Sequence, residues 1–316
     1  MLQSFSVAFN AVFPFVIYLG VGYFAVRIKL ADEAFMEKLN RLIFKLLFSV
    51  LMFKNVYTAT VESIPSATLI IVSVAGIIGL ILLLLLIVPK LSKENPRRGV
   101  IIQALFRGNF ILYGIPLVTH VFGEERAAIT GFMTLIVVSL FNIAAVIILE
   151  SYNEHGEGIK IGRILLNLAK NPLMQGCVAG LIFFALGIKL PKFLDTPVNA
   201  LGNLVTPVSM ITLGGTLKFK AFGKNRNAIL SVNVIRLILI PLVMLAIGYA
   251  FGLRQAELYM MLVVFGTPVA VASYPMAVNM GGDGELAGQI VFTSTVISLF
   301  TIFAFTFMLA QLGLIV

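Results

Sequence analysis

Charged residues are scarce in this sequence. They make up 12% of its 316 residues, whereas hydrophobic residues make up 59% and the mean hydropathy is +1.04. A soluble domain of ordinary composition carries about 25% charged residues. The composition therefore excludes an ordinary soluble protein and predicts an all-α integral membrane protein, with the lipid bilayer as one of its partners.

Residue types that enzymes and metal sites use are also scarce. The single cysteine, Cys177, can form no internal disulfide bond, and the two histidines, His120 and His155, lie near the end of an apolar run and in a polar segment. No HExxH motif or cluster of His and Cys is present, and no base is evident near a serine nucleophile. We therefore expect that the protein is not an enzyme and that it binds no metal and no cofactor.

Apolar runs of about 20 residues recur along the whole chain, which is the length a helix needs to cross about 30 Å of hydrocarbon. All fourteen acidic residues lie in loops or near the ends of these runs, which argues against a proton relay of Asp or Glu at mid-membrane. The first run has no basic region before it and no small-residue cleavage pattern, so we expect it to be retained. We predict ten spans, at residues 6–27, 37–57, 67–89, 99–120, 127–150, 172–188, 196–217, 228–252, 256–279 and 286–312.

The basic residues are distributed unevenly between the two sides of the predicted spans. Sixteen of the 23 Lys and Arg residues fall on one side, five fall on the other, Lys54 among them, and Arg107 and Arg236 lie within spans. The positive-inside rule then places both termini outside the cell membrane. The net charge of +9 is thus explained by orientation and by anionic lipid headgroups, and we expect no nucleic acid as a partner.

The two halves of the sequence repeat each other. GVGYFAVRIKL at 20–30 is similar to GLIFFALGIKL at 180–190, an offset of 160, and Pro116 matches Pro275 at an offset of 159. Five spans per copy is an odd number, so the second copy must enter the membrane from the opposite side. We predict two inverted five-helix repeats, at 1–151 and 172–316, joined by a polar cytoplasmic linker at 152–171.

Two predicted spans contain helix-breaking residues at equivalent places. The fourth has RGNFILYGIPLV at 107–118, and the ninth has GTPVAVASYPMAV at 266–278. A proline within a helix lacks the N–H and its ring clashes with the preceding turn, so we expect breaks at Pro116, Pro268 and Pro275. One proline often only kinks such a helix, but paired breaks in inverted repeats point to a binding site at mid-membrane. Half-helix N-termini there would favour an anion, and freed carbonyls would favour a cation.

Four segments, FRGNFILYGIPLV, LNRLIFKLLFSVLMF, TPVSMITLGGTL and GTPVAVASYPMA, resemble the auxin efflux carrier family of PIN-like transporters, and the resemblance covers nearly the whole chain. It implies a scaffold of spans 1, 2, 6 and 7, a transport domain of spans 3–5 and 8–10, and crossing of the broken fourth and ninth helices at the substrate site. It also implies a possible homodimer through the scaffold. Because the family moves organic anions, it implies a substrate such as an auxin, malate or malonate.

Three residues are candidate substrate ligands, and for each of them two roles are open: Asn109, Arg107 and Arg236. The amide of Asn109 both donates and accepts hydrogen bonds, so it is expected either to bind a carboxylate or to cap the broken helix. The resemblance assigns an asparagine here to the crossing site. Arg107 is expected either to bind an anion through its planar guanidinium or to reach lipid headgroups, and the same alternatives hold for Arg236.

The other candidates surround the breaks or face them from the seventh span. Ser and Thr in membrane helices most often bond to their own helix, and small residues often serve packing, so each has a structural role as its alternative. They are Gly114 and Pro116 in the fourth span, Ser209 and Thr212 in the seventh, and Thr267, Pro268, Ser273, Tyr274, Pro275 and Asn279 in the ninth.

From these features we expect a secondary transporter of a small organic anion that works by alternating access around a site at mid-membrane. A channel or a sodium-coupled symporter of the bile-acid carrier type is the alternative, because freed carbonyls and amides also hold Na⁺. A membrane sensor without transport is less expected, because no soluble output module is visible in the sequence.

Overall fold

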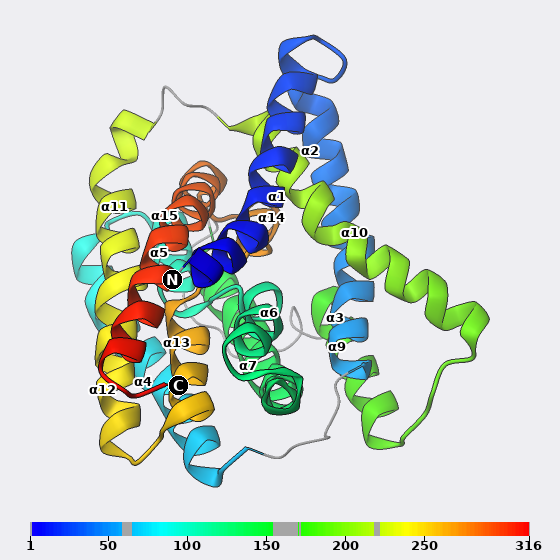
Figure 1. Cartoon of the computed structure of the whole chain (residues 1–316). Helices are drawn as coiled ribbons and strands as arrows, with labels where there is room; N and C mark the ends of the chain where they lie inside the picture. The colour runs from blue at the N-terminus through cyan, green and yellow to red at the C-terminus, as the bar shows by residue number, and fades with distance from the viewer. Residues whose placement is uncertain (1, 59–64, 154–169, 171, 218–221, 316) are drawn as a thin grey trace.

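The protein is helical throughout the residues that the computed structural model describes, which are 2–58, 65–153, 170, 172–217 and 222–315 (Figure 1). Side chains are described for these residues except 2–12, 15, 111–112, 115–116, 124–128 and 222. Within this part of the chain no strand forms, and one isolated antiparallel bridge pairs Gly108 with Val269. The expected all-α class is confirmed, whereas the linker expected at 152–171 lies almost wholly outside the described residues.

Each predicted span coincides with one helix or with a run of consecutive helices. The first half of the chain forms α1 (Leu2–Arg27), α2 (Glu33–Leu42), the π-helical turn η1 (Ile43–Leu47), α3 (Phe48–Tyr57), α4 (Ala67–Leu91), α5 (Asn95–Phe106), α6 (Phe110–Phe122) and α7 (Glu124–Ser151). The second half forms α9 (Pro172–Ala185), α10 (Lys192–Thr216), α11 (Phe222–Val234), the π-helical turn η3 (Ile235–Leu239), α12 (Ile240–Ala250), α13 (Gln255–Gly266), α14 (Ser273–Asn279) and α15 (Gly284–Gln311).

Four helical stretches of the described chain are long and apolar enough to cross a membrane by themselves: Ala67–Leu91, Ile129–Ser151, Gly223–Ala250 and Gly284–Gln311. In α4, only 22% of the most apolar stretch is buried inside the structure, and the side chains of Ile71, Leu82 and Leu86 are more than half exposed. A helix that presents so many large aliphatic side chains outward is suited to lipid rather than to water. That all ten predicted ranges cross the bilayer, as two inverted repeats, stays a prediction.

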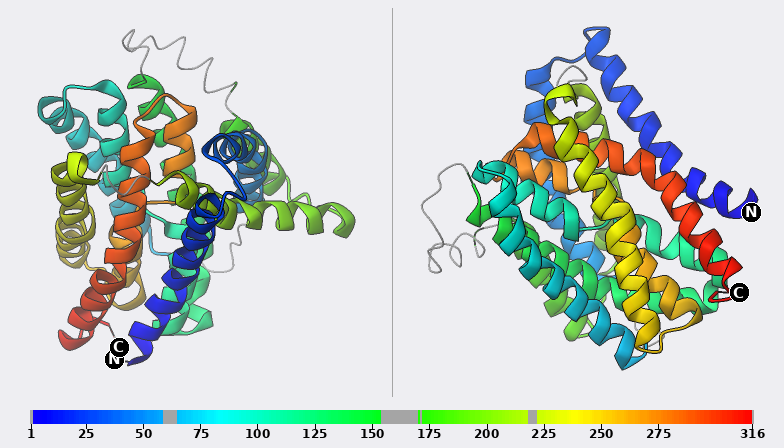
Figure 2. Two further views of the ribbon diagram at one scale, coloured as in Figure 1. Left: turned by 90° about the horizontal axis from the view of Figure 1, so that it is seen from above. Right: turned by 90° about the vertical axis from the view of Figure 1, so that its left-hand side faces the viewer.

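The helices pack in two groups, which lie side by side in Figures 1 and 2. In the first group α1 packs against α10, and α3 packs against α9 and α10, with α2 and η1 beside them. The second group contains α4 to α7 and α11 to α15. The first group corresponds to the spans expected to form a scaffold and the second to the expected transport domain, and these two roles stay predictions. The beginning of α1 and the end of α15 lie close together (Figure 2).

Close helix contact in the first group depends on glycine. A Cβ atom on Gly214 of α10 would meet the carbonyl oxygen of Leu19 in α1, and a Cβ on Gly176 of α9 would meet the carbonyl oxygen of Ser49 in α3. Small residues at such places let helix backbones approach closely, which is a common means of association between membrane helices. These glycines therefore allow the close packing that holds the first group of helices together.

Side-chain caps fix where two helices of the second group, α4 and α15, begin. Ser66 caps α4 by accepting the Leu69 N–H at 3.1 Å, and its own N–H and hydroxyl donate to the carboxylate of Glu257 in α13 at 2.8 and 2.9 Å. Asp283 caps α15 by accepting the Leu286 N–H at 2.9 Å. Such caps satisfy N–H groups that have no partner within the helix, so they both start the helices and register them against their neighbours.

Candidate functional site

Two helices of the second group are interrupted, and the interruptions pair with each other. The first lies between α5 and α6 at residues 107–109, and the second lies between α13 and α14 at residues 267–272. The Asn109 N–H donates to the Pro268 carbonyl at 2.8 Å, and the Ala270 N–H donates to the Arg107 carbonyl at 3.2 Å, on either side of the Gly108–Val269 bridge. We call these two segments the crossing.

The prediction that the breaks lie at Pro116 and Pro275 is wrong, although Pro268 does lie within the second interruption. α6 continues through Pro116 to Phe122. Pro275 is the third residue of α14, where an N–H would have no partner within the helix, so its absence costs nothing there. The interruptions fall instead where the two segments can satisfy each other's freed backbone groups.

Other groups complete the hydrogen bonding of the crossing. The Val269 N–H donates to the hydroxyl of Ser294 in α15 at 3.2 Å. Arg236, in η3, is fully buried, and its guanidinium donates to carbonyl oxygens at the ends of both α5 and α13. Irregular backbone at membrane depth is tolerated only where protein or water satisfies it, and here protein groups do so.

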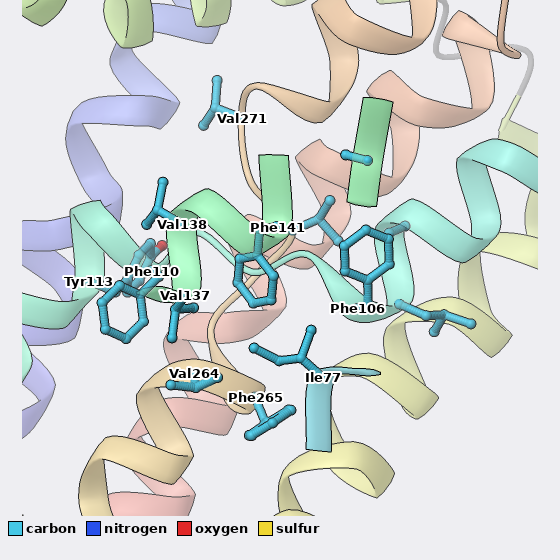
Figure 3. Close-up of a cluster of buried hydrophobic side chains, with 14 of the residues drawn as sticks. Ile77, Phe106, Phe110, Tyr113, Val137, Val138, Phe141, Val264, Phe265 and Val271 are labelled. Carbon is cyan, nitrogen blue, oxygen red and sulfur yellow. The ribbon is translucent and has the colours of Figure 1, made fainter. Parts of the chain in front are cut away.

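The crossing is embedded in apolar side chains (Figure 3). Phe106, at the end of α5, meets Phe141 of α7 edge to face with ring centroids 6.0 Å apart. Ile77 of α4 and Phe265 of α13 belong to the same buried cluster (Figure 3). Because the surroundings are apolar, hydrogen bonds and charges at the crossing act more strongly than they would in water.

A cavity of about 380 Å³ lies against the crossing, with walls from both groups of helices. This volume lies within the range of small-molecule sites. α1, α3 and α10 of the first group face the crossing and α7 of the second group across the cavity, and no Asp or Glu is among the described residues that line it. We call it the crossing cavity, and its polar lining consists of Tyr18, Lys54, Asn55, Arg107, Asn109, Asn142, Asn203, Thr206 and Ser209.

Asn109 is held by its backbone and leaves its side chain available. The residue is the N-cap of α6 and is 7% exposed, and its side chain makes no cap hydrogen bond. Its amide nitrogen, Nδ2, has no hydrogen-bond partner in the described part of the chain. A buried amide without a partner at the wall of a cavity is a ready donor for a ligand, because leaving it unpaired is unfavourable.

Arg107 is buried beside the cavity and does not reach lipid headgroups. It is 3% exposed, and its guanidinium donates at 2.6 Å both to the Asn142 side-chain oxygen in α7 and to the sulfur of Met276 in α14. No carboxylate of the described residues pairs with it, since the ion pair of this part of the chain joins Arg97 to Asp283 at 3.5 Å. A buried charge without a counter-charge is costly, so an anion in the cavity would relieve that cost.

Of the predicted site residues, the cavity brings together Arg107, Asn109 and Ser209. Three hydroxyl or amide candidates instead bond within their own helices: Thr212 to the Ser209 carbonyl at 2.8 Å, Thr267 to that of Val263 at 2.9 Å, and Asn279 to that of Pro275 at 2.8 Å. These three residues therefore have the structural role that was the alternative to ligand binding.

The remaining candidates lie near the crossing without lining the cavity. A Cβ on Gly114 would meet the methyl group of Thr130 at 2.9 Å, so this glycine serves the packing of α6 on α7. The hydroxyl of Tyr274 bonds that of Thr216 at 2.6 Å, beside a second and smaller cavity. Ser273 is buried with its hydroxyl unpaired among the described residues, and it does not line the crossing cavity.

Much of the polar lining was not predicted from the sequence. Lys54, which was expected in an external segment, lies in α3, lines the cavity and donates to the side-chain oxygen of Asn203 in α10. Asn142 lies in the middle of α7, where a polar residue in an apolar run would have been a signal. Asn55, Asn203 and Thr206 gave no comparable signal, because each lies in a segment with other polar residues nearby.

Helices of membrane-spanning length, paired interruptions and a cavity with polar lining residues between two groups of helices are together characteristic of helical membrane transporters. The chain belongs to the auxin efflux carrier family: the family model described as "Membrane transport protein" matches residues 7–164 and 159–306. This confirms the family that the four sequence segments indicated. It also makes the chain a multi-pass membrane protein of a transporter family and not of an enzyme family.

Relatives of the chain carry names of the same kind. It is 25% identical to an uncharacterized transporter of Methanocaldococcus jannaschii over 296 residues, which covers 89% of this chain and 92% of the relative. It is 23% identical to an uncharacterized transporter of Methanothermobacter thermautotrophicus over 281 residues, covering 88% and 91%. It is 24% identical to an uncharacterized transporter of Escherichia coli over 273 residues, covering 84% and 85%.

Proposed function

We propose that the protein is a secondary transporter of a small organic anion, such as a carboxylate, which binds in the crossing cavity. One observation carries this proposal: Asn109, whose amide nitrogen has no partner among the described residues, and Arg107, whose guanidinium pairs with no carboxylate of that part of the chain, line the same cavity. An amide donor and a cation at one wall are complementary to a carboxylate, which accepts hydrogen bonds and carries negative charge.

The electrostatics of the cavity favour an anion from more than one side. α6 has thirteen residues and begins at Phe110, which lines the cavity, so the partial positive charge of its N-terminus lies there. Lys54 adds a second cation from the first group of helices. Because no carboxylate of the described residues lines the cavity, these positive groups are not offset locally.

The position of the cavity supports alternating access. Lys54, Asn203 and Ser209 contribute one wall from the first group, and the crossing contributes the other wall from the second. A rigid-body movement of one group against the other would therefore open the cavity to either side of the membrane in turn. We propose that the first group is the stationary scaffold and that it also provides the homodimer contact.

Transport by purified protein in proteoliposomes tests the proposal. Uptake of radiolabelled malate, malonate and indole-3-acetate is measured with and without a sodium gradient and an imposed membrane potential, against protein-free liposomes. We expect saturable uptake of at least one acid. Absence of uptake of all three acids under every gradient, from protein shown to be folded, would contradict a carboxylate transporter and favour another substrate class or a sensor.

A further inference from the structure

Arg236 occupies the carbonyl ends of both interrupted helices. Its side chain is fully buried, and it lies in η3, a π-helical turn in the middle of the helix formed by α11, η3 and α12. Its guanidinium donates to the carbonyl oxygens of Leu105 at 3.0 Å and Phe106 at 3.2 Å in α5. It also donates to the carbonyl oxygens of Val264 at 3.5 Å, in the last turn of α13, and of Thr267 at 3.1 Å, the residue that follows α13.

These carbonyls are groups that would otherwise attract a cation. Each helix C-terminus carries a partial charge of roughly −0.5, so two of them together nearly balance one guanidinium. Freed carbonyl oxygens at broken membrane helices are also the ligands with which transporters hold a coupled Na⁺. In this chain the charge of a side chain fills that role, because Arg236 contacts the ends of both helices at once.

We propose that Arg236 is the resident cation of the crossing: it holds the carbonyl ends of α5 and α13 in place of a metal ion, so that the crossing works without bound Na⁺. This proposal deepens the proposed function, and it rests on that function in every test that measures uptake. Arg236 is then a positioning residue, since it contacts backbone carbonyls and is not among the residues that line the cavity.

Two further contacts support this assignment. A Cβ on Gly108 would meet both a guanidinium nitrogen of Arg236 and the hydroxyl of Thr267, so the chain has glycine at a place where the guanidinium passes close to the first interruption. No carboxylate of the described residues pairs with Arg236, whose partners are carbonyl oxygens alone. The two buried arginines therefore differ: Arg236 bonds to carbonyl oxygens at two helix ends, whereas Arg107 lines the cavity and bonds to the side chains of Asn142 and Met276.

Chemical rescue tests the role of the guanidinium directly. Arg236→Ala is expected to lower uptake of the acid that the wild type accepts by at least about 100-fold, because several hydrogen bonds to a charged group are lost. Guanidinium ion at about 10 mM, far below its denaturing molar concentrations, is expected to restore at least about tenfold of that loss, whereas tetramethylammonium is not. Arg226→Ala, on the exposed side of α11, is the matched control and should transport normally.

Arg236→Lys separates the shape of the side chain from its charge. Lysine keeps the charge but lacks the planar fork that reaches several carbonyls, so intermediate uptake is expected. Loss in folded Arg236→Ala protein that guanidinium does not reverse would overturn the proposal. Wild-type uptake should also change less than about twofold when choline replaces Na⁺, whereas a loss beyond about tenfold would overturn it even if the alanine variant does not fold.

A stability measurement keeps this proposal separate from the proposed function. In purified protein, guanidinium at the same low concentration is expected to raise the thermal midpoint of Arg236→Ala and to leave those of the wild type and Arg226→Ala unchanged. No transport is needed for this readout. Absence of acid uptake by the wild type together with this selective stabilisation would contradict the proposed function alone, and equal midpoints with and without guanidinium would contradict the resident cation.

Discussion

Asn109 donates its backbone N–H to the carbonyl oxygen of Pro268 at 2.8 Å, and the two residue numbers differ by 159. The same offset relates Pro116 to Pro275 in the sequence repeat. Two inverted copies that meet on their own twofold axis must meet at equivalent residues. The bond thus lies where an axis between the predicted repeats would pass, which supports the inverted arrangement.

Gly108→Ala should damage the crossing. The added Cβ would meet a nitrogen of Arg236 and the hydroxyl of Thr267. Overpacking of this kind is expected to cost about 1–3 kcal/mol of stability and to abolish transport, because the guanidinium must leave the helix ends. Thermal unfolding in detergent and uptake in proteoliposomes check this, with Gly223→Ala as control, since a Cβ there meets nothing within 4 Å. Wild-type behaviour of Gly108→Ala would show that the crossing tolerates displacement of Arg236.

Replacing Arg107 should weaken substrate binding more than it affects folding. Arg107→Gln removes the positive charge beside the cavity and leaves a polar side chain, so KM for the accepted acid is expected to rise at least about tenfold. Arg107→Lys keeps the charge without the planar fork, so its KM should lie between those of the wild type and Arg107→Gln. Initial uptake rates over a range of substrate concentrations check this, with the exposed Arg226→Gln as control. An unchanged KM in Arg107→Gln would remove Arg107 from the binding site.

Gly214→Ala should loosen the first group of helices. The new Cβ would meet the carbonyl oxygen of Leu19, a backbone atom that cannot move independently of α1. We expect a loss of stability of about 1–3 kcal/mol. Gly20→Ala is the matched control, because a Cβ on Gly20 meets nothing within 4 Å and alanine favours helix by about 0.5–1 kcal/mol. Equal thermal midpoints of the two variants would contradict close packing of α1 on α10.

The helical class and the family follow from the sequence because they depend on features that are local in the chain. Apolar runs of sufficient length predict helices near their observed bounds, as in α4, expected at 67–89 and observed as Ala67–Leu91. The family resemblance likewise lies in four short segments, one of them around Asn109. Neither inference requires knowledge of which distant residues meet.

The crossing itself could be predicted only in outline. Proline indicated interrupted helices, but the interruptions fall at 107–109 and 267–272, because there each segment supplies hydrogen bonds to the other. Arg236 gave no sequence signal for its role, since its partners are backbone carbonyls of two distant helices. Lys54 was expected in an external segment because it lies near the end of a predicted span. Its contact with Asn203 of α10 could not be known from the sequence.

Uptake by Asn109→Ala tests most directly the claim that the substrate binds at the crossing cavity. Malate, malonate and indole-3-acetate are offered to proteoliposomes that contain equal amounts of folded wild type, Asn109→Ala and the control Asn227→Ala, whose side chain is exposed on α11. Loss of one hydrogen bond to a charged group predicts that uptake by Asn109→Ala falls at least about tenfold, while Asn227→Ala matches the wild type. Wild-type uptake by Asn109→Ala would contradict the account, because the unpaired amide at the cavity wall would then take no part in binding.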